Sequence, residues 1–285
     1  MAPMKRLAIY AHYDRSPQVA GHVLHCLRHI AELGFQLSFV SNSEISSASG
    51  EILKKFCERI IVRENTGLDF CMWQRGLADY DLTQFEELLL TNSSIIGPLS
   101  PLAPIWESPA VAGCDFWGLT DNDEFKPHLS SYFLVFRQRV LHSERFREFW
   151  RTVLPYKTKW QVIFSYELGL TGWLEEGGFS WRAAFPRQHI VETYRSARGF
   201  WKTFGDRARV LNHIYRNREM PTQNTTLLYP EILLRCGMPF LKVSLLHQKS
   251  MRIQPSAAFS LLEKNGLPLE ILQELRQTYS VPKKN

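Results

Sequence analysis

The sequence predicts an α/β fold in which a mostly parallel sheet is flanked by helices. Short apolar runs typical of buried strands alternate with segments whose apolar residues recur at helical spacing. Polar residues follow several of these runs directly, where the strands would end. Parallel strands joined by right-handed crossovers bring their carboxyl ends to one edge of the sheet, and α/β proteins bind ligands there.

The elements follow from this alternation, with Gly34 stopping the first helix and Gly177 stopping a later one. The expected strands are 7–11, 35–40, 60–62, 85–90, 116–119 and 132–136. The expected helices are 19–33, 51–57, 69–77, 146–154, 165–176, 229–236 and a single terminal helix at 261–279. We expect a first domain over 1–200 and a C-terminal helical extension over 201–285 that packs on it.

The composition is that of a globular protein, with 45% hydrophobic residues, 13% aromatic residues and eight tryptophans. The five cysteines are widely spaced, so neither a disulfide framework nor a zinc site is indicated. The N-terminus enters a strand without a signal-peptide pattern, which favours a cytoplasmic protein. The net charge of +6 suits phosphate groups, nucleic acid or an anionic membrane, or is ordinary solvated charge. The basic residues are scattered without a nucleic-acid recognition motif, so we expect no nucleic-acid partner.

A first polar cluster follows the strand at 60–62 and contains Asn65, Gly67 and Asp69. Glycine allows the backbone to approach a ligand closely, and the two polar side chains could hold a base or a ribose. The alternative is a helix start capped by Asn65 or Thr66, with Asp69 in the first turn, where the helix dipole favours it.

A second polar cluster, Asn92-Ser93-Ser94, ends the strand at 85–90. Two such clusters on neighbouring strand ends would make one site. Many sugar-nucleotide transferases carry an Asp-x-Asp element at this strand end, whose carboxylates hold a divalent cation against the diphosphate. This cluster has no carboxylate, and a polar turn before Gly97-Pro98 is the alternative.

Three further positions could carry chemistry. Asp121 and Asp123 lie in an acidic loop that could bind a cation or a hydroxyl group, or could simply be solvated. His128 enters a strand among hydroxyl side chains. Glu167 lies near an expected helix start, where it could deprotonate an acceptor hydroxyl, or could be a first-turn glutamate stabilised by the helix dipole.

The order of these clusters resembles the GT-A class of nucleotide-sugar glycosyltransferases, and more closely the rhamnan synthesis protein F family. The resemblance rests on segments that cover most of the chain from about residue 65 to residue 242, each loose by itself but fairly specific in shared order. The matching segments are Asn65–Phe70, Thr91–Ser94 with Gly97–Leu99, Asp115–Asp121, His128–Phe136, Tyr166-Glu167, Asn224-Thr225 and Gly237–Lys242.

The resemblance implies a GT-A-like fold and transfer of a sugar, typically L-rhamnose from a dTDP-rhamnose-like donor, during cell-surface polysaccharide assembly such as that of an O-antigen. It also implies a lipid-linked glycan acceptor and peripheral association with the cytosolic membrane face. In the family pattern an aspartate stands where this chain has Ser93. That departure leaves the requirement for Mg²⁺ or Mn²⁺, and the identity of the donor, open.

The leading hypothesis is therefore an inverting glycosyltransferase, with Glu167 as the general base and Asp121 in reserve. The residues expected to bind the donor are Tyr10, Asn65, Gly67, Asp69, Asn92, Ser93 and Ser94, with His128 and Lys242 countering diphosphate charge. The alternative, prompted by Ser93, is a non-catalytic module that binds sugar nucleotides or glycans within an assembly complex.

Overall fold

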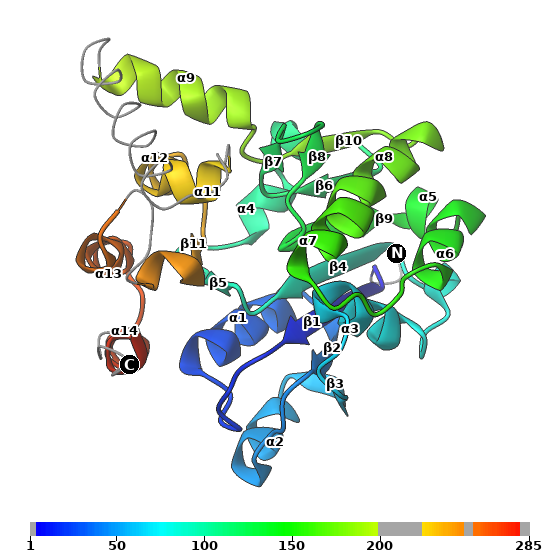
Figure 1. Cartoon of the computed structure of the whole chain (residues 1–285), viewed down its shortest axis with the longest axis horizontal. Coiled ribbons are helices and arrows are strands. Elements are labelled where there is room, and N and C mark those ends of the chain that lie inside the picture. Colours follow the sequence, from blue (N-terminus) through cyan, green and yellow to red (C-terminus); the bar gives the residue numbers. More distant parts are fainter. Residues whose placement is uncertain (1–3, 199–223, 248–252, 280–285) are drawn as a thin grey trace. The chain divides into compact units, whose positions relative to one another are not determined.

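The computed structural model describes residues 4–198, 224–247 and 253–279 of the chain (Figure 1). The chain divides into two compact units. The first unit comprises residues 1–93, 102–119 and 128–184, and the second comprises 94–101, 120–127 and 185–285. The domain boundary that the sequence predicts near residue 200 falls outside the described residues and stays a prediction.

The first unit is built on a seven-stranded sheet in the order β10-β6-β9-β4-β1-β2-β3. The strands are β1 Arg6–His12, β2 Phe35–Ser41, β3 Cys57–Val62, β4 Glu87–Asn92, β6 Phe116–Gly118, β9 Phe133–Arg137 and β10 Trp181–Ala183. Strands β1 to β4 pair in parallel, as does β10 with β6, whereas β9 runs antiparallel to both of its neighbours. The predicted α/β class with a mostly parallel sheet is confirmed.

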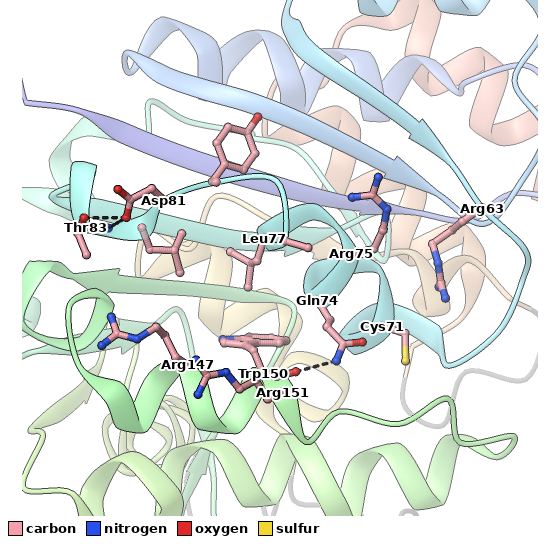
Figure 2. A pocket seen from close by; sticks show the side chains of 13 residues that line it. Arg63, Cys71, Gln74, Arg75, Leu77, Asp81, Thr83, Arg147, Trp150 and Arg151 are labelled. Atoms are coloured by element: carbon pink, nitrogen blue, oxygen red, sulfur yellow. Dashed lines mark hydrogen bonds between the residues drawn. The ribbon is translucent and has the colours of Figure 1, made fainter.

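Helices and short turns connect these strands. The elements are α1 Gly21–Glu32, α2 Ser47–Leu53, α3 Leu68–Leu77, η1 Leu82–Gln84, α4 Ala103–Trp106, η2 Pro109–Val111, a short strand β8 His128–Leu129, α5 Gln138–Leu141, α6 Glu144–Arg151, α7 Lys159–Val162, η3 Ile163–Glu167 and α8 Leu168–Glu176. Alternate residues of β1 and β4 point into a core formed with α3, α6 and the helices that follow it. In Figure 2, Gln74 of α3 donates a hydrogen bond of 2.7 Å to the carbonyl of Trp150 in α6.

The second unit contains mostly helices. Its elements are β5 Ile95–Ile96, β7 Asp121–Asn122, α9 Arg187–Arg198, α11 Thr225–Leu228, α12 Pro230–Arg235, β11 Leu241–Lys242, η4 Val243–Leu246, α13 Pro255–Lys264 and α14 Leu269–Tyr279. Strand β11 pairs antiparallel with β5. A separate apolar core joins this pair to α13 and α14. The C-terminal helices that the sequence predicts are confirmed as helices.

Several predicted boundaries are wrong. The helix expected at 51–57 lies earlier, over Ser47–Leu53, because Ser46 caps it by accepting a hydrogen bond of 3.2 Å from the backbone of Ser49. The single terminal helix is in fact two helices, separated at Gly266 (φ 81°). Strand β10 and helix α9 were not predicted, since neither carries a clear apolar period.

Helix α3 lies unusually close to the sheet at Gly76. A Cβ atom on this residue would approach Ile9 Cγ2 to 2.5 Å and Val40 Cγ2 to 3.0 Å, so no larger side chain fits without a shift. Trp73, one turn earlier, donates from its indole nitrogen to the carbonyl of Thr91 at 3.0 Å. Both contacts fix the height of α3 above β1 and β4.

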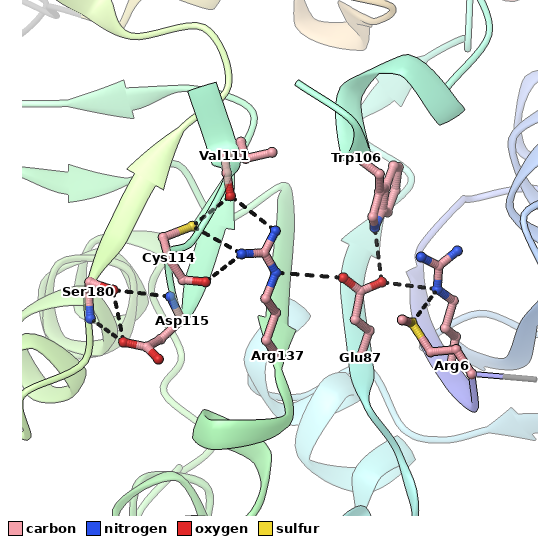
Figure 3. Close-up of polar contacts among 9 residues, drawn as sticks. Arg6, Glu87, Trp106, Val111, Cys114, Asp115, Arg137 and Ser180 are labelled. Atoms are coloured by element: carbon pink, nitrogen blue, oxygen red, sulfur yellow. Dashed lines mark hydrogen bonds and ion pairs between the residues drawn. The ribbon is translucent and has the colours of Figure 1, made fainter. Parts of the chain in front are cut away.

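A buried carboxylate, Glu87, lies at the start of β4, at the edge of the sheet where β1 and β4 begin (Figure 3). Its oxygens lie 3.1 Å from Arg6 Nε and 3.9 Å from Arg137 Nε, and accept from Trp106 Nε1 at 3.0 Å. Arg137 also donates to the carbonyl of Cys114 at 2.6 Å. Burial raises the pKa of Glu87, and the two guanidinium groups act in the opposite direction by favouring its charged form. This network joins the ends of three strands.

Candidate functional site

The carboxyl ends of β1, β2, β3 and β4 are joined by side-chain hydrogen bonds. We call this region the strand-end site, defined by residues 12–16, 41–44, 63–69 and 92–93. Strands β1 and β2 lie between β3 and β4, so the two polar clusters do not follow neighbouring strands as the sequence suggested. They nevertheless meet, because helix α3 runs from the end of β3 across the sheet.

The contact between the two clusters is a hydrogen bond from Asn92 Nδ2 to Asp69 Oδ2, 2.8 Å long. Asn92 ends β4 and is buried, and Asp69 occupies the first turn of α3, where the helix dipole favours a carboxylate. The bond is charge-assisted, which makes it stronger than a neutral one. Asp69 therefore has a fixed position at the edge of the sheet.

Gly67 begins α3 with a left-handed backbone (φ 72°, ψ 11°) that only glycine adopts readily. A Cβ atom at this position would overlap Cys71 Sγ and the backbone of Pro155. The alternative of a side-chain cap by Asn65 or Thr66 is wrong, since no side chain caps this helix and Gly67 is its N-cap.

Arg63 orders the loop between β3 and α3. Its guanidinium group donates to Asn42 Oδ1 at 3.0 Å and to the carbonyl of Thr66 at 2.8 Å. Asn42, which follows β2, in turn donates to Asn65 Oδ1 at 3.4 Å. These bonds fix Asn65 beside the end of β2.

A pocket of about 380 Å³ opens at the ends of β1 and β2. Its lining residues are Tyr13, Asp14, Arg15, Ser16, Pro17, Asn42, Ser43 and Glu44. The backbone of Asp14 donates to Ser43 Oγ at 2.8 Å, which holds the two loops together. The volume lies in the range of small-ligand sites. None of these residues was predicted from the sequence, although they follow β1 and β2 just as Asn65 follows β3.

Ser93 faces the same loop. Its hydroxyl oxygen accepts from the backbone of Tyr13 at 3.3 Å, so it ties the end of β4 to the loop after β1. Ser93 therefore has a structural partner in the loop after β1.

Two histidines are buried behind this loop. His12 ends β1, and its Nδ1 lies 2.9 Å from Ser41 Oγ. His22 lies in the first turn of α1, next to the backbone of Ser93. Burial lowers the pKa of each ring to about 4, against an opposing effect of Asp14 on both. Both rings are therefore neutral at physiological pH.

Glu167 lies at the same edge of the sheet, where it contacts the segment that leads into β9. Its Oε1 accepts from the backbone of Ser131 at 3.2 Å, just before β9 begins. Because β9 is antiparallel to β4, its first residue, Phe133, pairs with Thr91 at the carboxyl end of β4. Glu167 is half-buried, and one of its oxygens has a fixed donor.

The local helix around Glu167 differs from the prediction. Helix α7, the π-helical turn η3 and helix α8 follow one another directly, with Glu167 as the last residue of the turn. It is thus inside a helical segment, and the alternative of a first-turn glutamate stabilised by the dipole is wrong. Tyr166 helps to hold this turn, since its hydroxyl accepts from the backbone of Leu154 at 2.6 Å. Such π-turns are frequent at functional sites.

Two other predicted residues of the first unit are buried. Tyr10 is 0% exposed and stacks on Phe39 with the ring centroids 5.8 Å apart, and burial raises its pKa well above the usual value. Its contacts are those of a core residue. His128, in β8, is also buried. The next residue, Leu129, donates from its backbone to Thr171 Oγ1 at 3.1 Å and so anchors β8 on α8.

Three predicted residues belong to the second unit. Lys242 Nζ donates to Ser94 Oγ at 3.0 Å, beside the pairing of β5 with β11. Asp121 accepts from the backbone of Arg187 at 2.6 Å, at the start of α9. Burial raises the pKa of Asp121, while the Arg187 backbone opposes that rise. Asp123 forms an ion pair of 2.7 Å with Arg187.

The second cluster, Asn92 to Ser94, offers no charged oxygen to a divalent cation. Asp69 contacts this cluster, and one of its oxygens accepts the hydrogen bond from Asn92. Hard cations prefer several charged oxygens, whereas Asn92 and Ser93 offer neutral ones. Among the described residues no group of three or more His, Cys, Asp or Glu side chains could hold a metal ion.

Curated relatives match parts of the chain. An uncharacterized protein, y4gN, of Sinorhizobium fredii is 26% identical over 176 residues, covering 60% of this chain and 46% of the relative. The virulence protein VirA of Vibrio anguillarum is 33% identical over 124 residues, covering 41% of this chain and 39% of the relative. The chain thus spans less than half the length of these relatives.

Solved structures show partial likeness. A mannosyltransferase from Pyrobaculum calidifontis, in complex with GDP-Man and Mn²⁺, has a TM-score of 0.39 at 12% identity, covering 98% of this chain and 81% of that one. The glycosyltransferase GlyE of Streptococcus pneumoniae has a TM-score of 0.40 at 11% identity, covering 64% and 45%.

In the described part of the chain, no helix has the length and apolar character to cross a membrane. A family model described as "Rhamnan synthesis protein F" matches residues 37–200, which is more than half of the sequence. The chain therefore belongs to the rhamnan synthesis protein F family.

Proposed function

We propose that this chain is an inverting glycosyltransferase that moves a sugar from a nucleotide-diphospho-sugar to a hydroxyl group of a glycan. The observation that carries the proposal is the common edge of the sheet at which Asp69, Asn92 and Glu167 lie, next to a pocket of about 380 Å³. This is the edge at which α/β proteins bind nucleotides.

The donor nucleotide would occupy the pocket at the ends of β1 and β2. Asn42, Asn65 and Ser43 offer amide and hydroxyl groups for a base, and Asp14 or Asp69 offers a carboxylate for ribose hydroxyls. Hydrogen bonds from Arg63 and from the backbone hold these groups in place before a ligand arrives. Preorganised polar groups of this kind reduce the cost of binding.

Glu167 would be the general base. Ser131 fixes Oε1, which leaves Oε2 to take the proton of an acceptor hydroxyl. The acceptor oxygen then bonds to the anomeric carbon on one face, while the bond to the diphosphate breaks on the other. The proton ends on Glu167 and the electron pair on the diphosphate. We propose His128 as a candidate to counter the charge of that group, while the expected roles of Ser94, Lys242 and Asp121, which belong to the second unit, stay predictions.

The description of the family supports a finer proposal for the substrates. We propose rhamnose, or a related deoxyhexose, as the sugar, with a dTDP-linked donor and a glycan or lipid-linked glycan acceptor in cell-surface polysaccharide assembly. The expected cytoplasmic location, with peripheral association at the inner membrane face, stays a prediction. We also propose that transfer does not require Mg²⁺ or Mn²⁺; what supports this is that, in the described part of the chain, no group of three or more His, Cys, Asp or Glu side chains could hold a metal ion.

The decisive variant is Glu167→Gln, which keeps the acceptor for Ser131 but cannot take a proton. We expect kcat to fall by roughly 10²- to 10⁴-fold with donor affinity unchanged, the size of a general-base contribution. Glu175→Gln, at an exposed glutamate on α8, is the matched control and should retain full activity. A Glu167→Gln enzyme within about threefold of the wild type would contradict the assignment.

The substrates are identified by a thermal-shift screen against dTDP-, UDP- and GDP-linked sugars, each with and without a chelator. A ligand that binds only the folded state raises the melting temperature, and a bound donor should do so equally in chelator. The second candidate, a non-catalytic sugar-nucleotide-binding module, is favoured by the neutral Ser93. It would give a donor-induced shift without any transfer or hydrolysis of the donor.

A further inference from the structure

A strip of exposed side chains lies on the helical segment that leads to Glu167. We call it the aromatic strip; it consists of Trp160 and Gln161 in α7 and of Phe164 and Ser165 in η3. Positions i, i+1, i+4 and i+5 fall on one side of a helix, so these side chains share the solvent side of the segment. The strip thus places aromatic and polar groups together on the surface of the first unit.

The two aromatic rings of the strip are half exposed and hold each other in place. Trp160 and Phe164 are each 50% exposed, and their ring centroids lie 6.0 Å apart with the ring planes inclined by 30°. Residues four apart on a helix are neighbours, and the contact between these two rings stabilises their arrangement. The pair therefore presents a preorganised apolar surface to a ligand.

Gln161 and Ser165 flank the rings with hydrogen-bonding groups. Gln161 Oε1 accepts from the backbone of Thr158 at 3.3 Å and from its hydroxyl at 3.0 Å, in the capping box at the start of α7. These bonds orient the amide and leave the two N–H groups of Nε2 as donors, and Ser165 adds a hydroxyl group. A helix that inserts into a bilayer carries apolar residues across its exposed side, so these two polar residues favour a ligand that is part apolar and part polar.

Contacts on both sides place the aromatic strip at the strand-end site. Before the strip, the backbone of Pro155 lies against Gly67 at the start of α3, and α7 itself packs on α3. After the strip, Glu167 follows Phe164 by three residues, a rise of roughly 4 Å along a helix axis. Glu167 contacts Ser131, which leads into β9 at the carboxyl edge of the sheet. A ring stacked on the strip is therefore within one or two sugar units of the carboxylate.

We propose that the aromatic strip is an acceptor subsite that stacks on a pyranose ring of the glycan. One face of such a ring presents C–H groups, whose slightly positive hydrogens are attracted by the electron-rich face of Trp160 or Phe164. The hydroxyl groups project from the rim of the sugar, where Gln161 and Ser165 bond to them. The strip thus selects an acceptor ring with an apolar face and orients it toward Glu167. This proposal rests on the proposed function, because it assigns the part of the same site that takes the acceptor.

The first test measures sugar binding without turnover. The full chain is labelled with fluorotryptophan, and its fluorine NMR spectrum is titrated with the methyl pyranosides of L-rhamnose, D-glucose and D-galactose. The variant Trp160→Phe assigns the resonance of Trp160 by its loss. We expect at least one pyranoside to shift this resonance saturably, whereas sorbitol, an open-chain polyol without a ring face, should not. No saturable shift with any pyranoside, or an equal shift with sorbitol, would overturn the proposal.

Substitutions locate the contact. Phe164→Ala keeps the fluorine reporter at Trp160 and should weaken pyranoside binding roughly three- to tenfold, the size of one aromatic contact. Phe164→Tyr keeps an aromatic ring and should bind as the wild type does. The matched control is Leu269→Ala, which removes an exposed apolar side chain of α14 in the second unit and should leave binding unchanged. Wild-type affinity in Phe164→Ala, with circular dichroism showing that each variant is folded, would refute the placement.

Turnover separates this proposal from the proposed function. With a donor and a glycan that support transfer, Trp160→Ala should raise the KM for the acceptor roughly tenfold and leave the donor-induced thermal shift unchanged. Glu167→Gln should lower kcat and leave sugar binding at Trp160 unchanged. Saturable sugar binding without any transfer would contradict the proposed function while the sugar contact stands. Transfer with an acceptor KM that Trp160→Ala does not change would refute the subsite while the proposed function stands.

A bilayer is the other surface that exposed aromatic rings meet. Vesicles of phosphatidylcholine with phosphatidylglycerol are therefore added to the fluorotryptophan-labelled chain, and we expect the resonance of Trp160 to stay where it is. A shift with these vesicles, where the pyranosides cause none, would mean that the strip meets a membrane and would overturn the proposal.

Discussion

Acidification is expected to destabilise the first unit through the two buried histidines behind the strand-end site. The folded state holds the pKa of His12 and of His22 at about 4, while an unfolded histidine has a pKa of about 6.5. The unfolded chain therefore binds more protons in the range between these values. Stability that is present above the unfolded pKa is lost as the pH falls toward the folded one.

The size of the effect follows from these values. Between about pH 8 and about pH 5, each ring should cost about 2 kcal/mol of unfolding free energy, and the two together about 4 kcal/mol. That is a large share of a typical domain stability of roughly 5–15 kcal/mol. Asp14 acts on both rings and favours their charged forms, but burial outweighs it.

Urea denaturation followed by circular dichroism, at both pH values, measures this loss. His22→Gln should reduce the pH-dependent loss by about 2 kcal/mol, and the double variant with His12→Gln by about 4 kcal/mol. Arg28→Gln, an exposed position on the same helix α1, is the control for substitution in that helix. The reasoning is refuted if the double variant loses as much stability on acidification as the wild type.

Two further predictions concern the start of α3. Asp69→Asn removes the charged acceptor of the bond from Asn92 and should lower the free energy of unfolding, measured by urea denaturation, by about 2 kcal/mol. The control is Asp79→Asn, whose partly exposed ion pairs contribute at most about 1 kcal/mol. If Asp69→Asn costs no more than this control, the bond does not hold the site. Gly67→Ala should cost at least about 2 kcal/mol because of its left-handed backbone and the overlap described above, whereas Gly50→Ala in α2, with open space around it, should stabilise by roughly 0.5 kcal/mol. Equal effects of the two glycine variants would contradict this account.

Part of the candidate site was predictable from the sequence, because α/β proteins bind ligands beyond the carboxyl ends of their parallel strands. Asn65, Asp69 and Asn92 were found because each follows an apolar run, and the structure joins them. Asp14 and Asn42 carry the same signal after β1 and β2, but neither was among the predicted site residues. Their role at the pocket becomes visible only when the strand order puts β1 and β2 at the centre.

Other features depend on contacts that a sequence pattern does not contain. The π-turn that ends at Glu167 is held by the hydroxyl of Tyr166, which reaches the backbone of Leu154 twelve residues earlier. Tyr10 follows the strand period, but its burial against Phe39 depends on the pairing of β1 with β2. The break in the terminal helix was signalled locally by Gly266 and Pro268, and that signal was missed.

The close approach at Gly76 couples the packing of one end of α3 to the position of its other end. Asp69 lies seven residues before Gly76 on the same helix, a distance of roughly 10 Å along its axis. A methyl group added at Gly76 would lift one end of the helix from Ile9 and tilt the other, so the carboxylate would move although nothing in the strand-end site had changed. Selection for a different ligand could therefore act on this remote contact. A substitution at Gly76 would change the position of the Asp69 carboxylate, and with it the specificity of the site, while every polar residue of the site stays the same.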